Sequence, residues 1–518
     1  MITALAHDAE TLRYLLVRSQ AELLEARLMV EKLKLQILHY KRAKFGASSE
    51  RLTEMAQLEL LVEELESERA AIGPDGTACA TEQAESSRKR PARKPLAAHL
   101  PRETLVHQPA NIERCACAGC NGALRLLGQD VAEVLDIVPA RFKVIRHVRP
   151  KYVCAKCQTI VQADAPGRPI ARGLAASGLL AHVLVSKYAD HLPLYRQSEI
   201  YAREGVELER STLAGMVGGA AALLEPLMGA LKLHVLAADK LHGDDTPVPV
   251  LAPGKGRTKT ARLWVYVRDE RPMAGTAPPA VWFQYSPDRR GEHPQTHLKS
   301  FTGILQADGY AGFDALYASG RVSEAACWAH ARRKYVELHK DTGSPQAQEA
   351  LRRIGELYVI EKAIRGKPPD ERCRVRQEQA QPRLAAFRQW MDQTLAATSV
   401  KSALARAILY SLRRWAALTG YASDGRIEID NNAAEREIRA VALGRKNWLH
   451  AGSDAGGERA AAMYSLIGSA KLNGMDPQAY LRHVFERIAD YPVNRVAELL
   501  PWNIAAHMMG DTPALLAA

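Results

Sequence analysis

Two pairs of cysteines with C-x-x-C spacing constrain the fold of this chain more than any other feature. They flank sequence typical of β-strands, VAEVLDIVPARFKVIRHVRPKYVC, and consist of Cys117 with Cys120 and Cys154 with Cys157. A C-x-x-C turn directs two thiolates at one tetrahedral ion, so two such turns supply the four ligands of a structural zinc site. We therefore predict a zinc-ribbon-like domain over residues 105–170 that binds Zn²⁺.

The bulk properties of the chain limit its compartment and its partners. At 518 residues it is too long for one hydrophobic core, and about three or four domains are expected. The start, MITALAHDAE, has acids where a signal peptide would carry lysine or arginine. No apolar run approaches the ~20 residues of a membrane helix. We predict a cytoplasmic protein without membrane association, in which cysteines are metal ligands or thiols rather than disulfides.

The net charge of +12 is typical of proteins that bind a polyanion, although proteins that never touch nucleic acid also reach it. The basic run SRKRPARKP lies in a segment rich in Gly, Pro, Ala and Ser, which we interpret as a linker over residues 71–104. Such a run is either simply solvated or makes salt-dependent contacts with phosphates.

The N-terminal part, residues 1–70, has a helical pattern. Apolar side chains recur every seven residues between 10 and 42, at Leu16, Leu23, Val30 and Ile37. About four heptads is near the minimum for a coiled coil. The segment is therefore either a coiled coil through which the chain forms a homo-oligomer or an amphipathic helix packed on its own domain.

The region after the cysteines changes from a helical to a strand-like pattern. Residues 171–235 are predicted to be helical, with a turn at Gly205 and a following helix capped by Ser211. These two helices are either a helix-turn-helix that binds DNA or ordinary packed helices. The runs HVLAADKLHGDDTPVPVL, ARLWVYVRD, AVWFQYSP and GILQADGYAGF then read as strands, and helices dominate again from about 324.

These patterns predict a multidomain α+β chain. A mixed α/β core is expected over residues 236–480, interrupted by a helical insertion at about 340–415, and residues 481–518 are expected to be a helical C-terminal segment.

Two of the predicted strands end in acids. Asp244 and Asp245 close KLHGDD, and Asp308 closes ILQAD. Each position suits either an Asx turn or a metal ligand held by a rigid strand. Glu435 has its own structural interpretation, because Asn432-x-x-Glu435 matches the spacing of a capping box with Asn432 as N-cap.

Taken together, two strand-borne aspartates and one helix-borne glutamate make a cage of hard oxygens that suits Mg²⁺ or Mn²⁺. Two such ions activate a water or a 3′-hydroxyl and stabilise the leaving oxygen of an in-line displacement. Nearby cations would neutralise phosphate and bind DNA, and these are Arg436, Arg439, Arg445 and Lys446.

Several long motifs closely resemble the insertion sequence 66 family of bacterial transposases. They are LHGDDTPVPVLAPGKGRTKTARLWVYVRD, LQADGYAGFDAL, CWAHARRKY and IDNNAAEREIRAVALGRKNWLHAGSDAGGERAAAMYSLI. KFGASSER, the cysteine region and ELLPWN extend the resemblance over nearly the whole chain, in the order of the family.

The resemblance implies a DDE transposase with a ribonuclease H-like catalytic core. By motif, the first aspartate is Asp244, the second is Asp308 and the glutamate is Glu435. The first motif is usually Asp-Glu-Thr, and here it is Asp244-Asp245-Thr246, which leaves two adjacent candidates. We choose Asp244 by register.

The resemblance also implies that the cysteine region is a zinc-finger-like DNA-binding domain. The matching zinc ligands are Cys117, Cys120, Cys154 and Cys157. The spacing Cys327-x-x-His330 is only half of a metal site, and we interpret it as a structural feature of the core beside the active site.

The function implied is that of a transposase that binds the terminal inverted repeats of its element and cleaves and joins DNA strands. Its partners would be double-stranded repeat and target DNA, and the family suggests accessory proteins encoded beside it. The alternatives are a catalytically silent DNA-binding repressor and a nuclease that cuts without joining.

Overall fold

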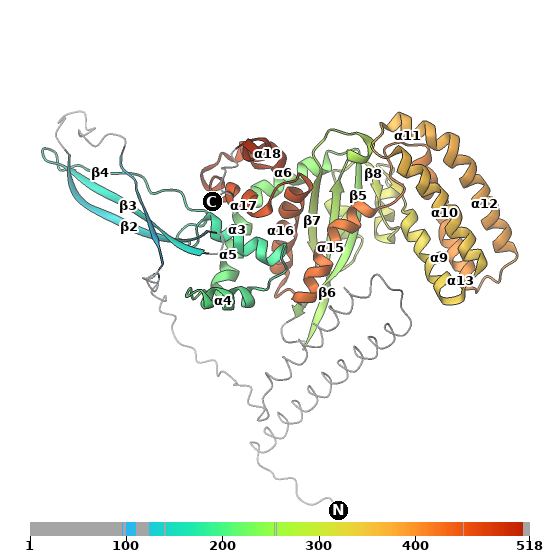
Figure 1. The fold of residues 1–518 in the computed structure, drawn as a ribbon, viewed down its shortest axis with the longest axis horizontal. Helices are drawn as coiled ribbons and strands as arrows, with labels where there is room; N and C mark the ends of the chain where they lie inside the picture. The colour runs from blue at the N-terminus through green and yellow to red at the C-terminus, as the bar shows by residue number, and fades with distance from the viewer. Residues whose placement is uncertain are drawn as a thin grey trace, which may run out of the picture. The chain divides into compact units, whose positions relative to one another are not determined.

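The computed structural model describes most of the chain after residue 95 (Figure 1). The described residues are 96, 100–109, 124–138, 141–252, 254, 256–448 and 450–510. The heptad segment 10–42, most of the predicted linker and the cysteines Cys117 and Cys120 lie outside these residues.

The sequence between the cysteine pairs forms two strands, as predicted, and these belong to a four-stranded sheet. A long antiparallel hairpin of β2 and β3 forms its centre, with β1 parallel to β3 on the other side and β4 antiparallel to β3. Alternate residues of β3 such as Phe142, Val144 and Val148 are buried, because successive side chains of a strand point to opposite faces. The strands are Arg102–Val106 (β1), Leu124–Val138 (β2), Arg141–Cys154 (β3) and Ile160–Gln162 (β4).

Four helices follow: Ser177–Tyr188 (α3), Leu194–Arg203 (α4), Arg210–Leu223 (α5) and Glu225–Leu236 (α6). The predicted turn at Gly205 is present, with φ of 79°. The predicted cap is wrong, because α5 begins before Ser211. Its N-cap is Glu209, and the Ser211 hydroxyl donates to the Glu209 carboxylate over 3.2 Å. No single described helix is long and apolar enough to cross a membrane, although α5 and α6, bent by 53°, meet that test as a pair.

A five-stranded sheet forms the centre of the following region (Figure 1), in the order β7-β6-β5-β8-β9. Strands β5, β6 and β7 pair antiparallel, whereas β8 is parallel to both β5 and β9. The strands are Lys240–Ala252 (β5), Arg257–Arg268 (β6), Ala280–Ser286 (β7), Gly303–Gln306 (β8) and Val322–Ala325 (β9).

The structure corrects the sequence interpretation of β5. Its first predicted residues belong to α6, and the strand does not end at Asp244 and Asp245 but continues to Ala252. Proline does not interrupt the pairing, because the Leu251 amide donates to Ala451 on the edge away from β6. Pro247 and Pro249 lie two and four residues before Leu251, and alternate residues of a strand direct their backbone groups to the same edge. The N–H groups that proline lacks would therefore face away from β6, and the pairing with β6 is kept.

Helix α16 covers the β7 edge of the sheet. The amides of Val281 and Phe283 on β7 donate to the hydroxyls of Ser469 and Ser465 on α16, over 3.1 and 2.7 Å. An exposed strand edge is a template for unwanted pairing, so these bonds protect it. The helices around the sheet are Glu292–His297 (α7), Asp314–Ala318 (α8), Asn432–Asn447 (α15), Asp454–Leu472 (α16), Pro477–Phe485 (α17) and Pro501–Gly510 (α18).

The helical segment predicted at about 340–415 is present between β9 and α15, and it starts earlier, at Trp328. It has a hydrophobic core of its own, which includes Trp328, Tyr335, Ile354 and Phe387. Its helices are Trp328–Thr342 (α9), Pro345–Ile364 (α10), Pro369–Val375 (α11), Gln381–Ala396 (α12), Ala403–Arg413 (α13) and Trp415–Thr419 (α14).

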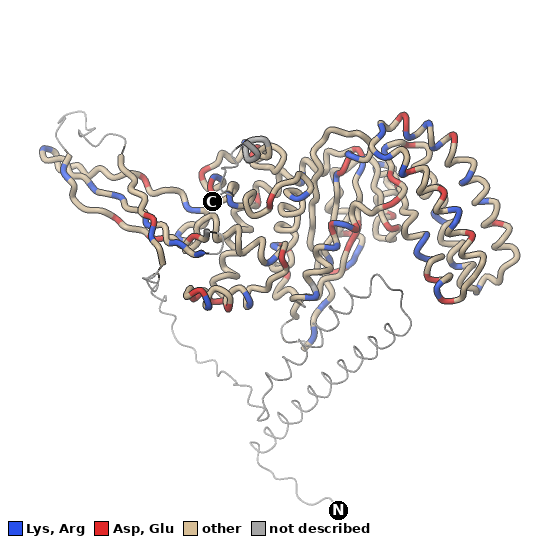
Figure 2. Tube along the Cα trace, viewed as in Figure 1, with Lys and Arg blue, Asp and Glu red and all other residues tan. Residues whose placement is uncertain are grey.

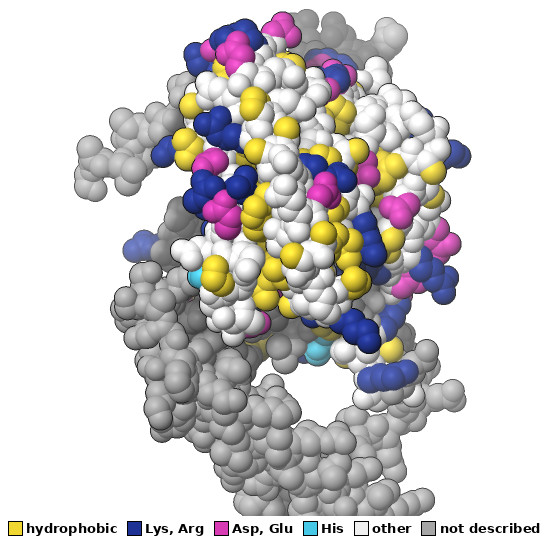
Figure 3. Space-filling model, turned by 90° about the vertical axis from the view of Figure 1, so that its right-hand side faces the viewer, with side chains coloured by type: hydrophobic (Ala, Val, Ile, Leu, Met, Phe, Trp, Pro, Cys, Tyr) yellow, Lys and Arg dark blue, Asp and Glu magenta, His cyan; other side chains and the backbone are white. Residues whose placement is uncertain are grey.

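The outer surface of this helical segment mixes both signs of charge. Figure 2 shows Lys and Arg beside Asp and Glu along its helices, and several are ion pairs one turn apart, such as Arg352 with Glu356 and Arg388 with Asp392. On the face in Figure 3, hydrophobic side chains lie scattered among these charges. Paired charges of this kind stabilise an exposed helix by a few tenths of a kcal/mol each.

Candidate active site

Asp244 and Asp245 are neighbours on β5, but their surroundings differ. The Asp245 carboxylate forms ion pairs with Arg262 on β6, over 3.0 Å, and with Arg289, over 2.8 Å. Adjacent residues of a strand point to opposite faces, so the Asp244 side chain lies on the other face. Two arginines thus neutralise Asp245, whereas the carboxyl group of Asp244 is influenced by the acids Asp308 and Glu435.

Asp308 lies two residues beyond β8, in a tight turn. Its carboxylate accepts the Tyr310 amide over 3.0 Å, which is the predicted Asx turn. Gly309 has φ of 82°, and a Cβ there would lie 2.2 Å from Nε of Arg414. Tyr410 donates to the Asp308 carbonyl over 3.1 Å. Helix α13 and the residue after it therefore hold this turn, and the turn directs the aspartate.

Glu435 lies in the first turn of α15, but not in the predicted capping box. The N-cap is Asn431 rather than Asn432, and its side chain makes no capping hydrogen bond. Instead the side-chain NH2 group of Asn431 donates to the Gly243 carbonyl over 2.9 Å. The side-chain oxygen of Asn431 lies 3.0 Å from Nδ1 of His242. The capping box is absent because α15 begins one residue earlier than predicted, so that Ala434 rather than Glu435 is the third residue of the helix. These bonds join the start of α15 to the strand that carries Asp244.

The three carboxylates are electrostatic neighbours. The pKa of Asp244 is raised to about 7, chiefly by burial and in addition by the negative charges of Asp308, Asp245 and Glu435. Asp244, Asp308 and Glu435 come from a strand, a turn and a helix, so the fold has placed acids together that repel one another. A group of carboxylates with this repulsion binds a divalent cation well, because the cation supplies the missing positive charge.

Two residues of α9, His330 and Arg333, and the N-cap of this helix, Cys327, lie close to Glu435. Nδ1 of His330 lies 3.7 Å from Oε1 of Glu435, and the Arg333 guanidinium lies 3.9 Å from Oε2. Burial lowers the pKa of His330, and the nearby acids only partly oppose this. The sulfur of Cys327 accepts a hydrogen bond from the backbone N–H of Asn431 over 3.2 Å, and this bond joins the starts of α9 and α15. Cys327 therefore has the structural role that its spacing suggested, whereas the sequence did not indicate the contact of His330 with Glu435.

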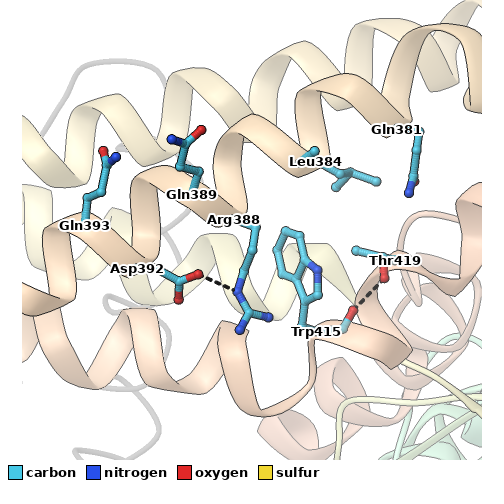
Figure 4. Close-up of a pocket in the computed structure, with 9 residues that line it drawn as sticks. Gln381, Leu384, Arg388, Gln389, Asp392, Gln393, Trp415 and Thr419 are labelled. Carbon is cyan, nitrogen blue, oxygen red and sulfur yellow. Dashed lines mark hydrogen bonds and ion pairs between the residues drawn. The ribbon is translucent and has the colours of Figure 1, made fainter.

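A groove on the helical segment is separate from the three carboxylates. It lies between α12 and α14 and is lined by Leu384, Arg388 and Trp415 among others (Figure 4). Arg388 is paired with Asp392 over 2.9 Å, so its charge is already compensated. The groove lacks the clustered acids that mark the site on β5.

Family models match successive parts of the chain. The description "Transposase IS66 family" matches residues 172–459, which is more than half of the chain and includes all three carboxylates. The chain belongs to the IS66 family of transposases. Further matches are "IS66 C-terminal element" over 465–502, "zinc-finger binding domain of transposase IS66" over 114–158 and "Transposase C of IS166 homeodomain" over 32–105.

Two curated relatives of this IS66 chain are similar to it over most of their length. The uncharacterized protein y4hP of Sinorhizobium fredii is 43% identical over 494 residues, covering 91% of this chain and 88% of the relative. The uncharacterized protein y4jD of the same organism is 40% identical, covering 93% and 96%. Their names assign no activity.

The IS66 zinc-finger match spans all four predicted zinc ligands, of which the structure describes Cys154 and Cys157. Cys154 ends β3, and the Cys157 amide donates to its sulfur over 3.5 Å. The chain thus has a zinc-finger region and a homeodomain-like region for DNA binding.

The predicted DNA-binding cations of this IS66 chain lie on α15, the helix that carries Glu435. Arg436 and Arg439 are exposed, as is Lys446, whereas the side chain of Arg445 lies outside the described part. Their exposure leaves Arg436 and Arg439 accessible to a nucleic-acid backbone.

Proposed function

We propose that the chain is a DDE transposase that binds the terminal inverted repeats of its element and catalyses divalent-metal-dependent DNA cleavage and strand transfer. One observation supports the proposal: Asp244, Asp308 and Glu435 lie on separate elements, and the charges of Asp308 and Glu435 act on the carboxyl group of Asp244. The family membership supports the same reaction.

The sheet supports a ribonuclease H-like core for this domain. Three antiparallel strands followed by two parallel strands, in the order β7-β6-β5-β8-β9, match that arrangement, and Asp244 lies on the central strand. We assign the catalytic domain to residues 236–480, with the helices between β9 and α15 as its insertion. We assign the zinc-finger-like domain to residues 105–170.

The donor set at the site fits Mg²⁺ or Mn²⁺, since all three groups are carboxylates and Asp244 is held among like charges. Bound there, the cations would activate the attacking water or 3′-hydroxyl and stabilise the leaving oxygen. Asp244, Asp308 and Glu435 would hold them. Arg436 and Arg439 would bind phosphates of the strand and orient it against the carboxylates.

The test is to incubate purified protein with labelled DNA from the ends of its element in the presence of Mn²⁺. Joined products support the proposal, cleavage alone indicates a nuclease, and binding alone indicates a silent repressor. The variant Asp308→Asn should lose both products and keep DNA binding, because the zinc-finger region lies elsewhere. Asp341→Asn, a change of an exposed aspartate on α9, is the matched control and should remain active.

The zinc-finger region is expected to bind about one structural Zn²⁺ per chain. Metal analysis of the Cys154→Ser variant should show loss of this ion, because three sulfur ligands do not complete the tetrahedral site. The variant Cys79→Ser changes a cysteine outside the two pairs and should keep the zinc. A zinc-free preparation that folds and binds DNA normally would contradict this prediction.

A further inference from the structure

The contact between His330 and Glu435 leaves two polar atoms in an unusual position. Nδ1 of His330 and Oε1 of Glu435 are both buried, and neither has a hydrogen-bond partner among the described residues. They lie 3.7 Å apart, beyond the 2.7–3.2 Å of a normal N–H···O bond. Burying a polar atom without a hydrogen-bond partner destabilises a fold, so two such atoms side by side indicate that a ligand fits between them.

The surrounding backbone fixes the positions of both atoms. His330 lies in the first turn of α9, whose N-cap Cys327 accepts the Asn431 amide. The Trp328 amide also donates to the Ile429 carbonyl over 3.0 Å. The starts of α9 and α15 are thus joined at two points, which holds His330 against Glu435.

The geometry suits two ligands of one ion. Ligand atoms about 2.0–2.2 Å from a cation lie roughly 3–3.5 Å from each other at octahedral or tetrahedral angles. A shift of a few tenths of an ångström brings the two atoms to that spacing. The Cys327 thiol lies in the same cluster, but its hydrogen bond from Asn431 already accounts for it.

We propose that His330 is a ligand, through Nδ1, of the divalent cation that Glu435 binds, an inference that rests on the proposed function of the carboxylate site. Mg²⁺ is bound almost entirely by oxygen, whereas Mn²⁺ accepts an imidazole nitrogen more readily. His330 therefore makes the site favour Mn²⁺ over Mg²⁺. Arg333, at 3.9 Å from the other oxygen of Glu435, is 55% exposed and free to turn toward a phosphate instead.

The test is electron spin-echo envelope modulation spectroscopy of the full-length, zinc-loaded protein with added Mn²⁺. This method detects a ¹⁴N nucleus that is bonded to the ion. The wild type should show this ¹⁴N modulation, and His330→Phe should lose it. His330→Asn places an oxygen near the position of Nδ1, so it should also lose the modulation but keep a bound ion. Its affinity for Mn²⁺ should fall about tenfold or more relative to Mg²⁺.

The control is His339→Asn, which changes another histidine of α9 and should leave the spectrum unchanged. Persistence of the modulation in both His330 variants, or its absence from the wild type, would overturn the inference. So would a second zinc ion that disappears in Cys327→Ala, because Nδ1 would then belong to a separate zinc site. Asp308→Asn separates the two proposals: an Mn²⁺ affinity that is unchanged in this variant refutes the carboxylate site itself. Mn²⁺ binding that requires Asp308 but not His330 refutes only the histidine ligand.

Discussion

Asp244→Asn is expected to abolish DNA cleavage while raising the melting temperature of the metal-free protein above pH 7. Activity should fall on the order of a thousandfold or more, because a neutral amide holds a cation poorly. Stability should rise because the pKa of Asp244 is raised from 3.8 to about 7 by burial and by neighbouring carboxylates. The charged form is thus disfavoured in the folded protein, and asparagine removes that charge. A rise of about 2–4 °C corresponds to 1 kcal/mol in a domain of this size.

The stability difference between the wild type and Asp244→Asn should depend on pH. Between about pH 4 and pH 7 the folded protein keeps a proton that the unfolded chain has lost, so the wild type loses stability as the pH rises. The difference between wild type and Asp244→Asn should therefore be absent below pH 4 and complete above pH 7. Thermal denaturation in a series of buffers measures it, and equal melting temperatures at pH 8 would contradict it.

The neighbouring change Asp245→Asn should have the opposite effect on stability. Asp245 is paired with Arg262 and Arg289, and asparagine removes the negative charge beside the half-buried guanidinium of Arg262. We expect a cost of roughly 1–3 kcal/mol, reduced because Arg289 is exposed enough to be hydrated. Cleavage should survive in the folded fraction. An Asp245→Asn variant that is stable but inactive would exchange the roles of the two aspartates.

Glu435→Gln is expected to abolish strand joining without lowering the melting temperature. Its helix begins at an N-cap whose side chain makes no capping bond, so glutamine has no cap to break. Glutamine keeps the shape of the side chain but loses the charge that holds a cation near phosphate. Joining assays with Mg²⁺ and thermal denaturation of the same preparation measure the two effects.

The matched control for this change is Glu458→Gln. Glu458 is another glutamate of the motif, but it is exposed on α16, close to Tyr285 of the edge strand β7. Its replacement should leave joining unchanged. If Glu458→Gln is inactive and Glu435→Gln is active, the third carboxylate is Glu458 and our assignment is wrong.

Much of the secondary structure follows from local patterns. The strands between the cysteine pairs, the helices around Gly205 and the change to a mixed α/β region are read from residues close together in the chain. The strand β9 was not predicted, because VSEA has only four residues and no alternation. It becomes a strand because the backbone of β8 pairs with it.

The residue types that could bind a cation were determined by the sequence alone, because carboxylates, thiols and imidazoles keep their chemistry in any fold. Their roles depended on contacts between distant residues. The pairing of Asp245 with Arg289 decided which aspartate faces the other acids. Helix α15 begins with Asn431 as N-cap instead of Asn432, and the Asn431 side chain bonds to β5. The contact between His330 and Glu435 joins residues more than a hundred positions apart. No local pattern encodes such a contact, since it exists only once the sheet, α9 and α15 have packed together.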